Sequence, residues 1–180
     1  TYYASADYVS HSDENAPGLI NSLYRRVRRI TLAQKGRLLA NYFAQPGSLL
    51  DIGCGTGAFA GHMQSLGWRV NAVEPDAGAA QKARQRYGLE VNDESWLSTC
   101  AAQFDCITMW HVLEHVHQLQ ERFAQLWRLC APGGYVLIAV PNPQSIDSQH
   151  YGAFWAARDV PRHLYHFPPH MLRKRMEQEG

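Results

Sequence analysis

The sequence predicts an α/β domain built on a doubly wound parallel sheet with helices on both faces. From Ser48 onward, short apolar strands alternate with amphipathic helices, which favours repeated βαβ units. Residues 49–59 run from an apolar strand straight into a turn with glycine at alternate positions. Residues 135–140 are almost wholly apolar, as in a parallel strand covered on both faces. A chain of 180 residues with 46% hydrophobic content can bury one such core.

Residues 1–46 are expected to form a helical arm or cap ahead of this core. Residues 1–18 follow no clear period, whereas apolar residues over 19–30 recur at helical spacing. A second helix is predicted over about 32–43, ending before Pro46-Gly47. Arginines fill much of the first helix, and the net charge of only +1 favours a solvated basic face over a membrane-surface helix. These arginines are Arg25, Arg26, Arg28 and Arg29.

Residues 47–180 are expected to form the core, with residues 141–169 as a lid. Helices are predicted over 58–66, 76–88 and 96–102, and a long helix is predicted from Leu113 to a stop at residues 132–134. Strands are predicted over 49–52, 69–74, 89–92, 105–110 and 135–140. Because the carboxyl ends of parallel strands share one edge, Asp51, Glu74, Asp93 and His111 should gather there.

The glycine turn indicates a nucleotide-like ligand. Glycine lets the backbone turn sharply and lets a ligand approach closely, and the following helix presents free N–H groups. The spacing is G-x-G-x-G after Asp51, not the dinucleotide pattern G-x-G-x-x-G. A carboxylate there would repel a pyrophosphate but suits a ligand with an ammonium and a sulfonium group, such as S-adenosylmethionine. Glu74 lies about twenty residues further on, where a carboxylate accepts two ribose hydroxyls.

Asp51, the glycines and Glu74 together resemble motifs I and II of the class I S-adenosylmethionine-dependent methyltransferases. Residues 104–116 and 132–142 resemble that family's fourth and fifth strands. The resemblance implies a Rossmann-like fold, S-adenosylmethionine as cofactor and S-adenosylhomocysteine as product. Adenine would be contacted by Asn92, Asp93 or Glu94, which the sequence does not distinguish. The cofactor contacts implied are Asp51, Gly53, Cys54, Gly55, Gly57, Glu74, Pro75, Asp93, Glu94, Ser95, Trp110 and His111.

The segment after the fourth strand allows a second interpretation. His111 and His115 would share a helix face and, with Glu114 and His117, could hold a metal. The resemblance instead places this segment beside the cofactor, and most relatives need no metal for the reaction, so no metal is expected. Trp110 is interpreted first as a core residue and second as a neighbour of the sulfonium, through a cation–π contact.

Residues 154–167 closely resemble a segment of the bacterial methyltransferase subgroup that includes ubiquinone-biosynthesis-like enzymes, where it lies over the active site. If the acceptor is a hydroxyl, a general base would help, and His163, His111 or His166 could serve; the sequence does not decide between them, although His163 is slightly favoured. For Arg162 and His163, contact with the substrate and anchoring of the lid through Asp159 stay equally open. The substrate contacts expected are Tyr8, Arg162, His163 and Tyr165.

The predicted function is methyl transfer to a small or medium-sized acceptor, most often through oxygen in the family resembled. A non-catalytic S-adenosylmethionine-binding subunit is the alternative, and an aminopropyltransferase is disfavoured because no paired acids follow the fourth strand. The small net charge argues against nucleic acid as a partner. Four cysteines without a C-x-x-C pair suit reduced thiols in a cytoplasmic protein, and no apolar run is long enough to span a membrane.

In the family resembled, two further strands form an antiparallel hairpin beside the fifth strand, and they are missing from this sequence. We therefore expect the chain to continue beyond Gly180. The edge of residues 135–140 should be open, and these 180 residues alone should self-associate through it.

Overall fold

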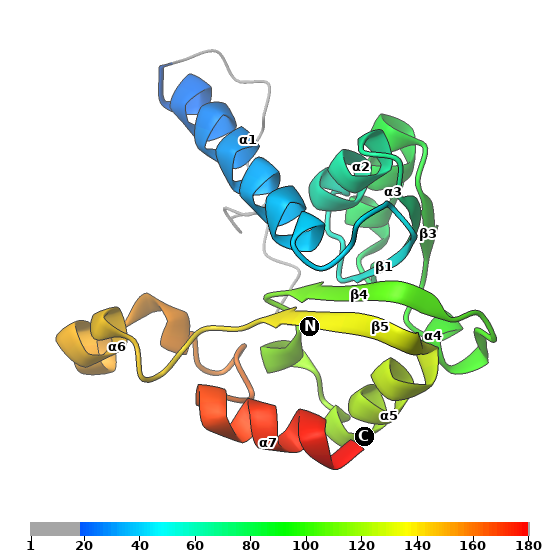
Figure 1. The fold of residues 1–180 in the computed structure, drawn as a ribbon. Helices are drawn as coiled ribbons and strands as arrows, with labels where there is room; N and C mark the ends of the chain where they lie inside the picture. The colour runs from blue at the N-terminus through cyan, green and yellow to red at the C-terminus, as the bar shows by residue number, and fades with distance from the viewer. Residues whose placement is uncertain (1–18, 180) are drawn as a thin grey trace.

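The computed structural model describes residues 19–179, which form a five-stranded sheet with helices on both faces (Figure 1). The strand order is β3-β2-β1-β4-β5, and every pairing is parallel. The direction of winding reverses between β1 and β4, which is where doubly wound sheets bind ligands. The predicted fold class is confirmed. The strands are β1 (Ser48–Ile52), β2 (Arg69–Val73), β3 (Glu90–Asn92), β4 (Phe104–Trp110) and β5 (Cys130–Ala139).

Seven α-helices are described in this part of the chain. In Figure 1, α1, α2 and α3 lie on one side of the sheet, and α5 and α7 on the other. The helices are α1 (Leu19–Ala40), α2 (Ala58–Ser65), α3 (Ala77–Tyr87), α4 (Trp96–Thr99), α5 (Leu119–Leu129), α6 (Ile146–Tyr151) and α7 (Pro169–Glu179). Short 3₁₀ helices lie at η2 (Leu113–His115), η3 (Gly152–Phe154) and η4 (Ala156–Arg158).

The core has two main layers, one on each face of the sheet. Successive side chains of a strand point to opposite faces, and Leu49 and Leu50 of β1 accordingly belong to different clusters. Leu50 packs in the cluster of Phe123 from α5, whereas Leu49 packs in that of Phe59 from α2. Because both leucines are fully buried, β1 is fixed from both sides, and so is the turn that follows it.

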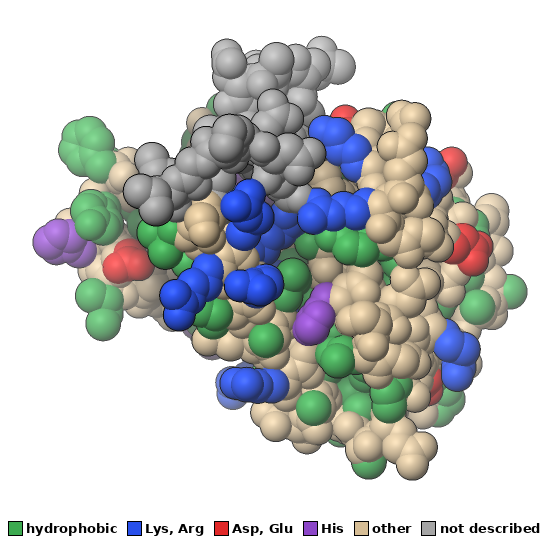
Figure 2. All heavy atoms as spheres, turned by 90° about the horizontal axis from the view of Figure 1, so that it is seen from above, with side chains coloured by type: hydrophobic (Ala, Val, Ile, Leu, Met, Phe, Trp, Pro, Cys, Tyr) green, Lys and Arg blue, Asp and Glu red, His purple; other side chains and the backbone are tan. Residues whose placement is uncertain are grey.

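The N-terminal region is one continuous helix, and the prediction of two helices is wrong. No glycine or proline interrupts residues 30–32, and the helix ends at Ala40, earlier than the predicted second helix. Arg25, Arg26 and Arg29 face solvent, as expected, but Arg28 is half-buried and its Nη2 donates to Thr56 Oγ1 at 3.5 Å. Figure 2 shows the basic side chains that gather on the face seen from above.

The predicted helices over 58–66 and 76–88 are confirmed as α2 and α3. Asp76 is the N-cap of α3, and its Oδ1 accepts from Ala79 N at 2.7 Å. Gly88 ends that helix in the left-handed conformation, and Gly67 follows α2 at a φ of 93°. Leu66, which follows α2, is about half exposed.

The predicted long helix from Leu113 to residues 132–134 is wrong at both ends. Leu113 begins only the single turn of η2, since Val116 is extended and α5 starts at Leu119. At the other end, α5 stops at Leu129, and β5 already begins at Cys130. The Pro-Gly-Gly sequence therefore lies inside the strand, near a register shift in its pairing with β4.

Among the described residues, β5 pairs only with β4 and forms one edge of the sheet. Its Tyr135 is partly exposed and packs against the rings of Tyr42 and Phe43, at centroid distances of 5.1 and 5.3 Å. The chain after α1 therefore covers part of this edge. Within residues 19–179, no helix combines the length and the apolar character needed to cross a bilayer.

Candidate active site

The turn after β1 holds three glycines in the left-handed region, with φ of 75° at Gly53, 56° at Gly55 and 80° at Gly57. Gly53 N and Cys54 N both donate to Val73 O, at 2.7 and 3.1 Å, which ties the turn to the end of β2. L-amino acids other than glycine pay about 1–2 kcal/mol for this conformation. Glycine is therefore required by the backbone at all three positions.

The three glycines differ in how much room a side chain would have at each position. A Cβ at Gly53 would lie 2.3 Å from Val112 Cγ2, and one at Gly57 would lie 2.8 Å from both Ala83 Cβ and Leu89 Cδ1. A Cβ at Gly55 would meet no atom of the described residues 19–179 within 4 Å. Gly53 and Gly57 thus allow close packing of the protein, whereas Gly55 leaves open space above the backbone.

Glu74 follows β2 and faces the same turn. Its Oε2 accepts from Gly55 N at 2.7 Å, and its Oε1 accepts from Asp76 N at 2.9 Å. Each carboxylate oxygen has a second lone pair. The structure therefore presents a carboxylate of fixed orientation beside the open space at Gly55, where the sequence predicts it.

Asp51 lies at the base of the site and is 2% exposed. Burial raises the pKa of its carboxyl to about 7, and nearby Glu74 adds to the rise; a hydrogen bond from Thr108 Oγ1 and the charge of Lys35 oppose it. The Thr108 bond is 2.7 Å long and joins β4 to β1. A cation next to this carboxyl would favour its charged form.

Lys35 of α1 is a site residue that the sequence analysis missed. Its Nζ lies 4.0 Å from the centroid of the Trp110 ring and 5.6 Å from that of Phe59. Burial lowers its pKa, and the charge of Asp51 opposes that change. A carboxyl and two aromatic rings thus surround a cation here. The only sequence signal for Lys35 is its helical spacing, which places it on one face of the helix with Arg28, Leu32 and Leu39.

Residues that follow β2 and β3 border a cavity of about 680 Å³. Pro75, Glu94 and Ser95 line it together with His115, so three predicted cofactor contacts share one wall. Glu94 also forms an ion pair with Arg122 of α5, a residue that the sequence analysis did not single out.

Two of the predicted cofactor contacts have local roles in this structure. Asp93 Oδ1 accepts from Ser95 N at 2.9 Å and from Ser95 Oγ, and these bonds lower the pKa of its carboxyl. Asp93 therefore shapes the turn before α4. The thiol of Cys54 has a raised pKa because of burial and the nearby Asp51 and Glu74. It is held neutral and is not an activated nucleophile.

His111 ends β4 with an unusual backbone, at a φ of 59°. Its N donates to Ala139 O at 2.8 Å, while its side chain is 66% exposed. Its Nδ1 lies 3.5 Å from Glu114 Oε1. The expectation that His111 and His115 share one face of a helix is wrong, because residues 111–118 between β4 and α5 contain only the single 3₁₀ turn of η2, which does not include His111.

In the lid, the structure shows the anchoring contacts that the sequence left open. Arg162 Nε donates to Asp159 Oδ1 at 3.0 Å, and His163 Nε2 lies 3.9 Å from Asp159 Oδ2. His163 Nδ1 donates to Ala157 O at 2.8 Å, and His166 Nε2 contacts Arg158 O at 3.0 Å. Contact with a substrate stays a prediction for Arg162, His163 and Tyr165. Tyr8 lies outside the described residues.

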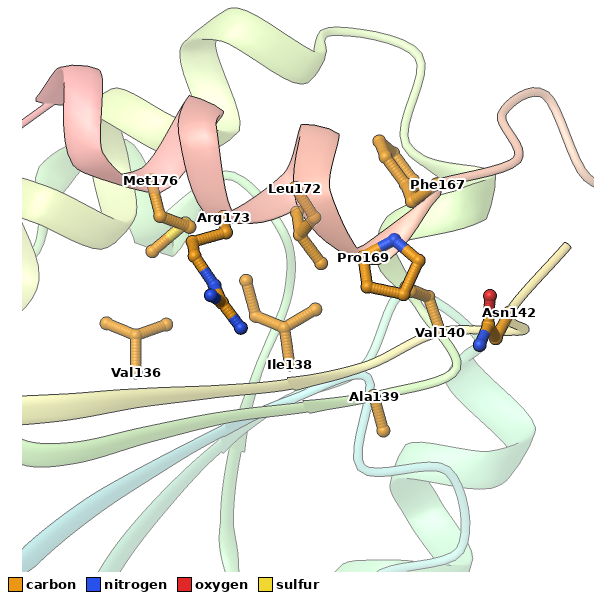
Figure 3. A pocket seen from close by; sticks show the side chains of 10 residues that line it. All are labelled: Val136, Ile138, Ala139, Val140, Asn142, Phe167, Pro169, Leu172, Arg173 and Met176. Atoms are coloured by element: carbon orange, nitrogen blue, oxygen red, sulfur yellow. The ribbon is translucent and has the colours of Figure 1, made fainter. Parts of the chain in front are cut away.

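A separate cavity of about 380 Å³ lies between β5 and α7 (Figure 3). Its walls are mainly apolar, with Ile138 and Leu172 facing each other across it and Arg173 reaching in from α7. None of the predicted site residues within 19–179 lines it. The candidate site is therefore the carboxyl edge of the sheet, where Asp51, Glu74 and the glycine turn meet.

Two solved structures are similar to this fold. The chain matches an S-adenosylmethionine-dependent methyltransferase from Archaeoglobus fulgidus at a TM-score of 0.66 and 24% identity, over 85% of this chain and 68% of that one. It matches magnesium protoporphyrin IX methyltransferase from Synechocystis, solved with bound S-adenosylhomocysteine, at a TM-score of 0.70 and 14% identity, over 93% and 80%. At these identities the likeness shows a shared fold.

Sequence relatives give a closer relationship. The chain is 32% identical over 137 residues to a malonyl-[acyl-carrier protein] O-methyltransferase from Serratia marcescens, covering 74% of this chain and 53% of that protein. It is 33% identical over 123 residues to a ubiquinone biosynthesis O-methyltransferase from a Caulobacter species, covering 63% and 49%. The chain thus spans about half the length of these curated relatives.

The family model described as "Methyltransferase domain" matches residues 24–180, from within α1 to the end of the chain. The match includes β1, the glycine turn, Glu74 and the lid. Together with the sheet order and the site geometry, it confirms the resemblance drawn from the sequence: this chain belongs to the methyltransferase domain family, within the class I S-adenosylmethionine-dependent methyltransferases.

Proposed function

We propose that this domain binds S-adenosylmethionine and transfers its methyl group to an oxygen of a small or medium-sized acceptor. The observation that carries the proposal is the carboxylate of Glu74, fixed by two backbone N–H groups beside the open space at Gly55. This arrangement fits a ribose with two neighbouring hydroxyls. Two of the sequence relatives are named as O-methyltransferases, which supports oxygen as the acceptor atom.

The cationic part of the cofactor fits the recess at Asp51. A carboxyl buried beside the rings of Trp110 and Phe59 favours a positive group, and Lys35 already places an ammonium there. Pro75, Glu94 and Ser95 would hold the adenine in the cavity that they line. Once bound, the cofactor supplies an activated methyl group, so the protein needs chiefly to align the two reactants. Such alignment lowers a barrier by up to about 7–11 kcal/mol.

We assign His111 as the residue that accepts the proton of the acceptor hydroxyl. Among the three predicted histidines, His163 and His166 have ring nitrogens in contact with lid carbonyls. The side chain of His111 is exposed at the carboxyl edge, and the buried carboxylate of Glu114 lies near its Nδ1.

We further propose that the protein works in the cytoplasm and uses no nucleic-acid partner. All four cysteines are free in the structure, which suits a reducing compartment. The net charge of +1 provides no strong attraction for a polyanion.

Calorimetric titration with S-adenosylhomocysteine tests the proposal. Glu74→Ala should weaken binding by about 100-fold or more, because each hydrogen bond to a charged acceptor contributes about 1.5–3 kcal/mol. Glu90→Ala is the matched control, since Glu90 is an exposed carboxylate on the neighbouring β3, and it should bind like the wild type. Equal affinity in wild type and Glu74→Ala would remove Glu74 from the site, and a wild type that binds no S-adenosylhomocysteine would overturn the proposal.

A further inference from the structure

A second cluster of polar side chains lies between the end of β4 and the lid. Glu114, His115 and His163 each offer one possible ligand atom, and these three atoms lie within 4.8 Å of one another. Glu114 and His115 belong to η2, whereas His163 comes from the lid. The lid therefore folds back across 48 residues of sequence to complete the cluster.

Glu114 is the unusual member of this cluster. It is 1% exposed, and neither of its carboxylate oxygens has a hydrogen-bond partner among the described residues. Burial of an ionised carboxylate without compensation costs several kcal/mol. The nearest nitrogen of His111 is 3.5 Å away, beyond a strong hydrogen bond. The environment of Glu114 thus calls for a positive charge close to its oxygens.

The two histidines of the cluster are held in one tautomer. His115 Nδ1 lies 3.0 Å from Arg162 O, and His163 Nδ1 lies 2.8 Å from Ala157 O. A carbonyl oxygen only accepts, so both Nδ1 atoms must carry the proton. The lone pair of each neutral ring is then on Nε2. Histidines that bind metals commonly have this arrangement, in which a backbone carbonyl fixes the opposite nitrogen.

We propose that Glu114, His115 and His163 bind one divalent first-row transition metal ion, for which zinc is the best probe. Two imidazoles and a carboxylate suit such an ion better than magnesium or calcium, which prefer oxygen ligands. Bonds of about 2.0–2.1 Å at tetrahedral angles place ligand atoms about 3.3–3.4 Å apart. The cluster must therefore contract by about 1.5 Å at its widest. This site departs from the expectation, drawn from the sequence, that no metal is bound.

The position of the site gives the metal a mechanical role. Leu164 N donates to Glu114 O at 2.8 Å, so the lid already contacts η2 through its backbone. A metal would add bonds from the carboxyl edge of the sheet to His163. It would neutralise Glu114 and fasten the lid over the edge at which β4 ends. Three protein ligands also leave a position for water or another oxygen.

Zinc titration of the EDTA-treated, dialysed full chain tests the inference by calorimetry. Wild type should bind one zinc ion per chain, and Glu114→Gln and His163→Gln should each weaken binding by about 10–100-fold or more. His117→Gln is the matched control, because His117 is exposed two residues after His115 and lies outside the cluster. It should bind zinc like the wild type. If Glu114→Gln does not fold, His163→Gln decides, since its substitution lies in the lid.

Limited proteolysis gives a second readout that needs no activity. Zinc should slow cleavage within residues 155–166 in wild type and in His117→Gln, but not in His163→Gln. Absence of stoichiometric zinc binding, or equal binding by His163→Gln, overturns the inference. S-adenosylhomocysteine titrated into the same samples keeps the two proposals apart, because a protein that binds this ligand but no zinc retains the proposed function and loses the metal site.

Discussion

The glycine turn and the lid are built in different ways, although both lie at the carboxyl edge of the sheet. The turn is held by backbone hydrogen bonds to β2 and follows a strand buried on both faces. The lid is held largely by side chains that contact carbonyls within the lid, and it exposes large apolar residues, with Phe154 90% exposed. The sheet therefore fixes the conformation of the glycine turn. The lid, where we propose that the acceptor binds, depends on a few local contacts, which makes it the easier region to vary.

Alanine substitutions in the turn should show the largest effects. Gly53→Ala combines a left-handed backbone with a methyl 2.3 Å from Val112 Cγ2. Strain of about 1–2 kcal/mol and overpacking of about 1–3 kcal/mol should lower the free energy of unfolding by about 2–5 kcal/mol. Gly55→Ala meets no neighbour and should cost only the strain, about 1–2 kcal/mol. Urea unfolding measures both.

The effects on the affinity for S-adenosylhomocysteine should follow a different order from the effects on stability. Gly55→Ala should lose more affinity for S-adenosylhomocysteine than stability, because its new methyl group enters the open space beside Glu74. Equal losses of stability in the two variants would show that the clash with Val112 is relieved at little cost, and that the turn is less rigid than the contrast with the lid requires.

Titration of Asp51 should give an intermediate effect. The pKa of the free protein's carboxyl is about 7, and a bound cation favours the charged form, so binding must release a proton below that pH. Affinity for S-adenosylhomocysteine should then rise by up to about tenfold per pH unit between pH 5 and 7 and level off above pH 7. Asp51→Asn should bind more weakly and lack this rise. A wild-type pH profile parallel to that of Asp51→Asn would contradict the assignment of the ammonium group to this recess.

Loosening the lid should have the smallest effect on stability. Asp159→Ala removes the partner of Arg162 and the carboxylate near His163, and a partly exposed ion pair contributes about 0–1 kcal/mol. The unfolding midpoint should barely move, while proteolytic cleavage within residues 155–166 should speed up. Asp147→Ala, at an exposed position of α6, is the control and should leave cleavage unchanged. A large loss of global stability in Asp159→Ala would make the lid part of the core.

The sequence predicted the parts of the fold that local patterns determine. The glycine turn, the cap at Asp76 and the stop at Gly88 depend on the conformational needs of a few neighbouring residues. Apolar runs predicted β1 and β4 because parallel strands are buried on both faces. Asp51 and Glu74 followed from these elements, since each lies at a fixed place relative to a strand end.

What the sequence could not predict depends on contacts between distant segments. Lys35 reaches Trp110 only because α1 packs across the sheet. The backbone at Val116 is extended and interrupts the helix that the apolar spacing from Leu113 suggested, since tertiary packing overrides a helical period in a short segment. The proximity of Glu114 to His163 arises from the path of the lid, which no local pattern records.

The two backbone bonds to Glu74 have a consequence for the entropy of binding. A free glutamate side chain loses up to about 1.5–2 kcal/mol of rotamer freedom when it is fixed in place. In this chain, Gly55 N and Asp76 N already fix it before any ligand arrives. The side chain therefore loses this rotamer freedom when the end of β2 folds. Binding of a pair of hydroxyls then costs little further side-chain entropy at Glu74.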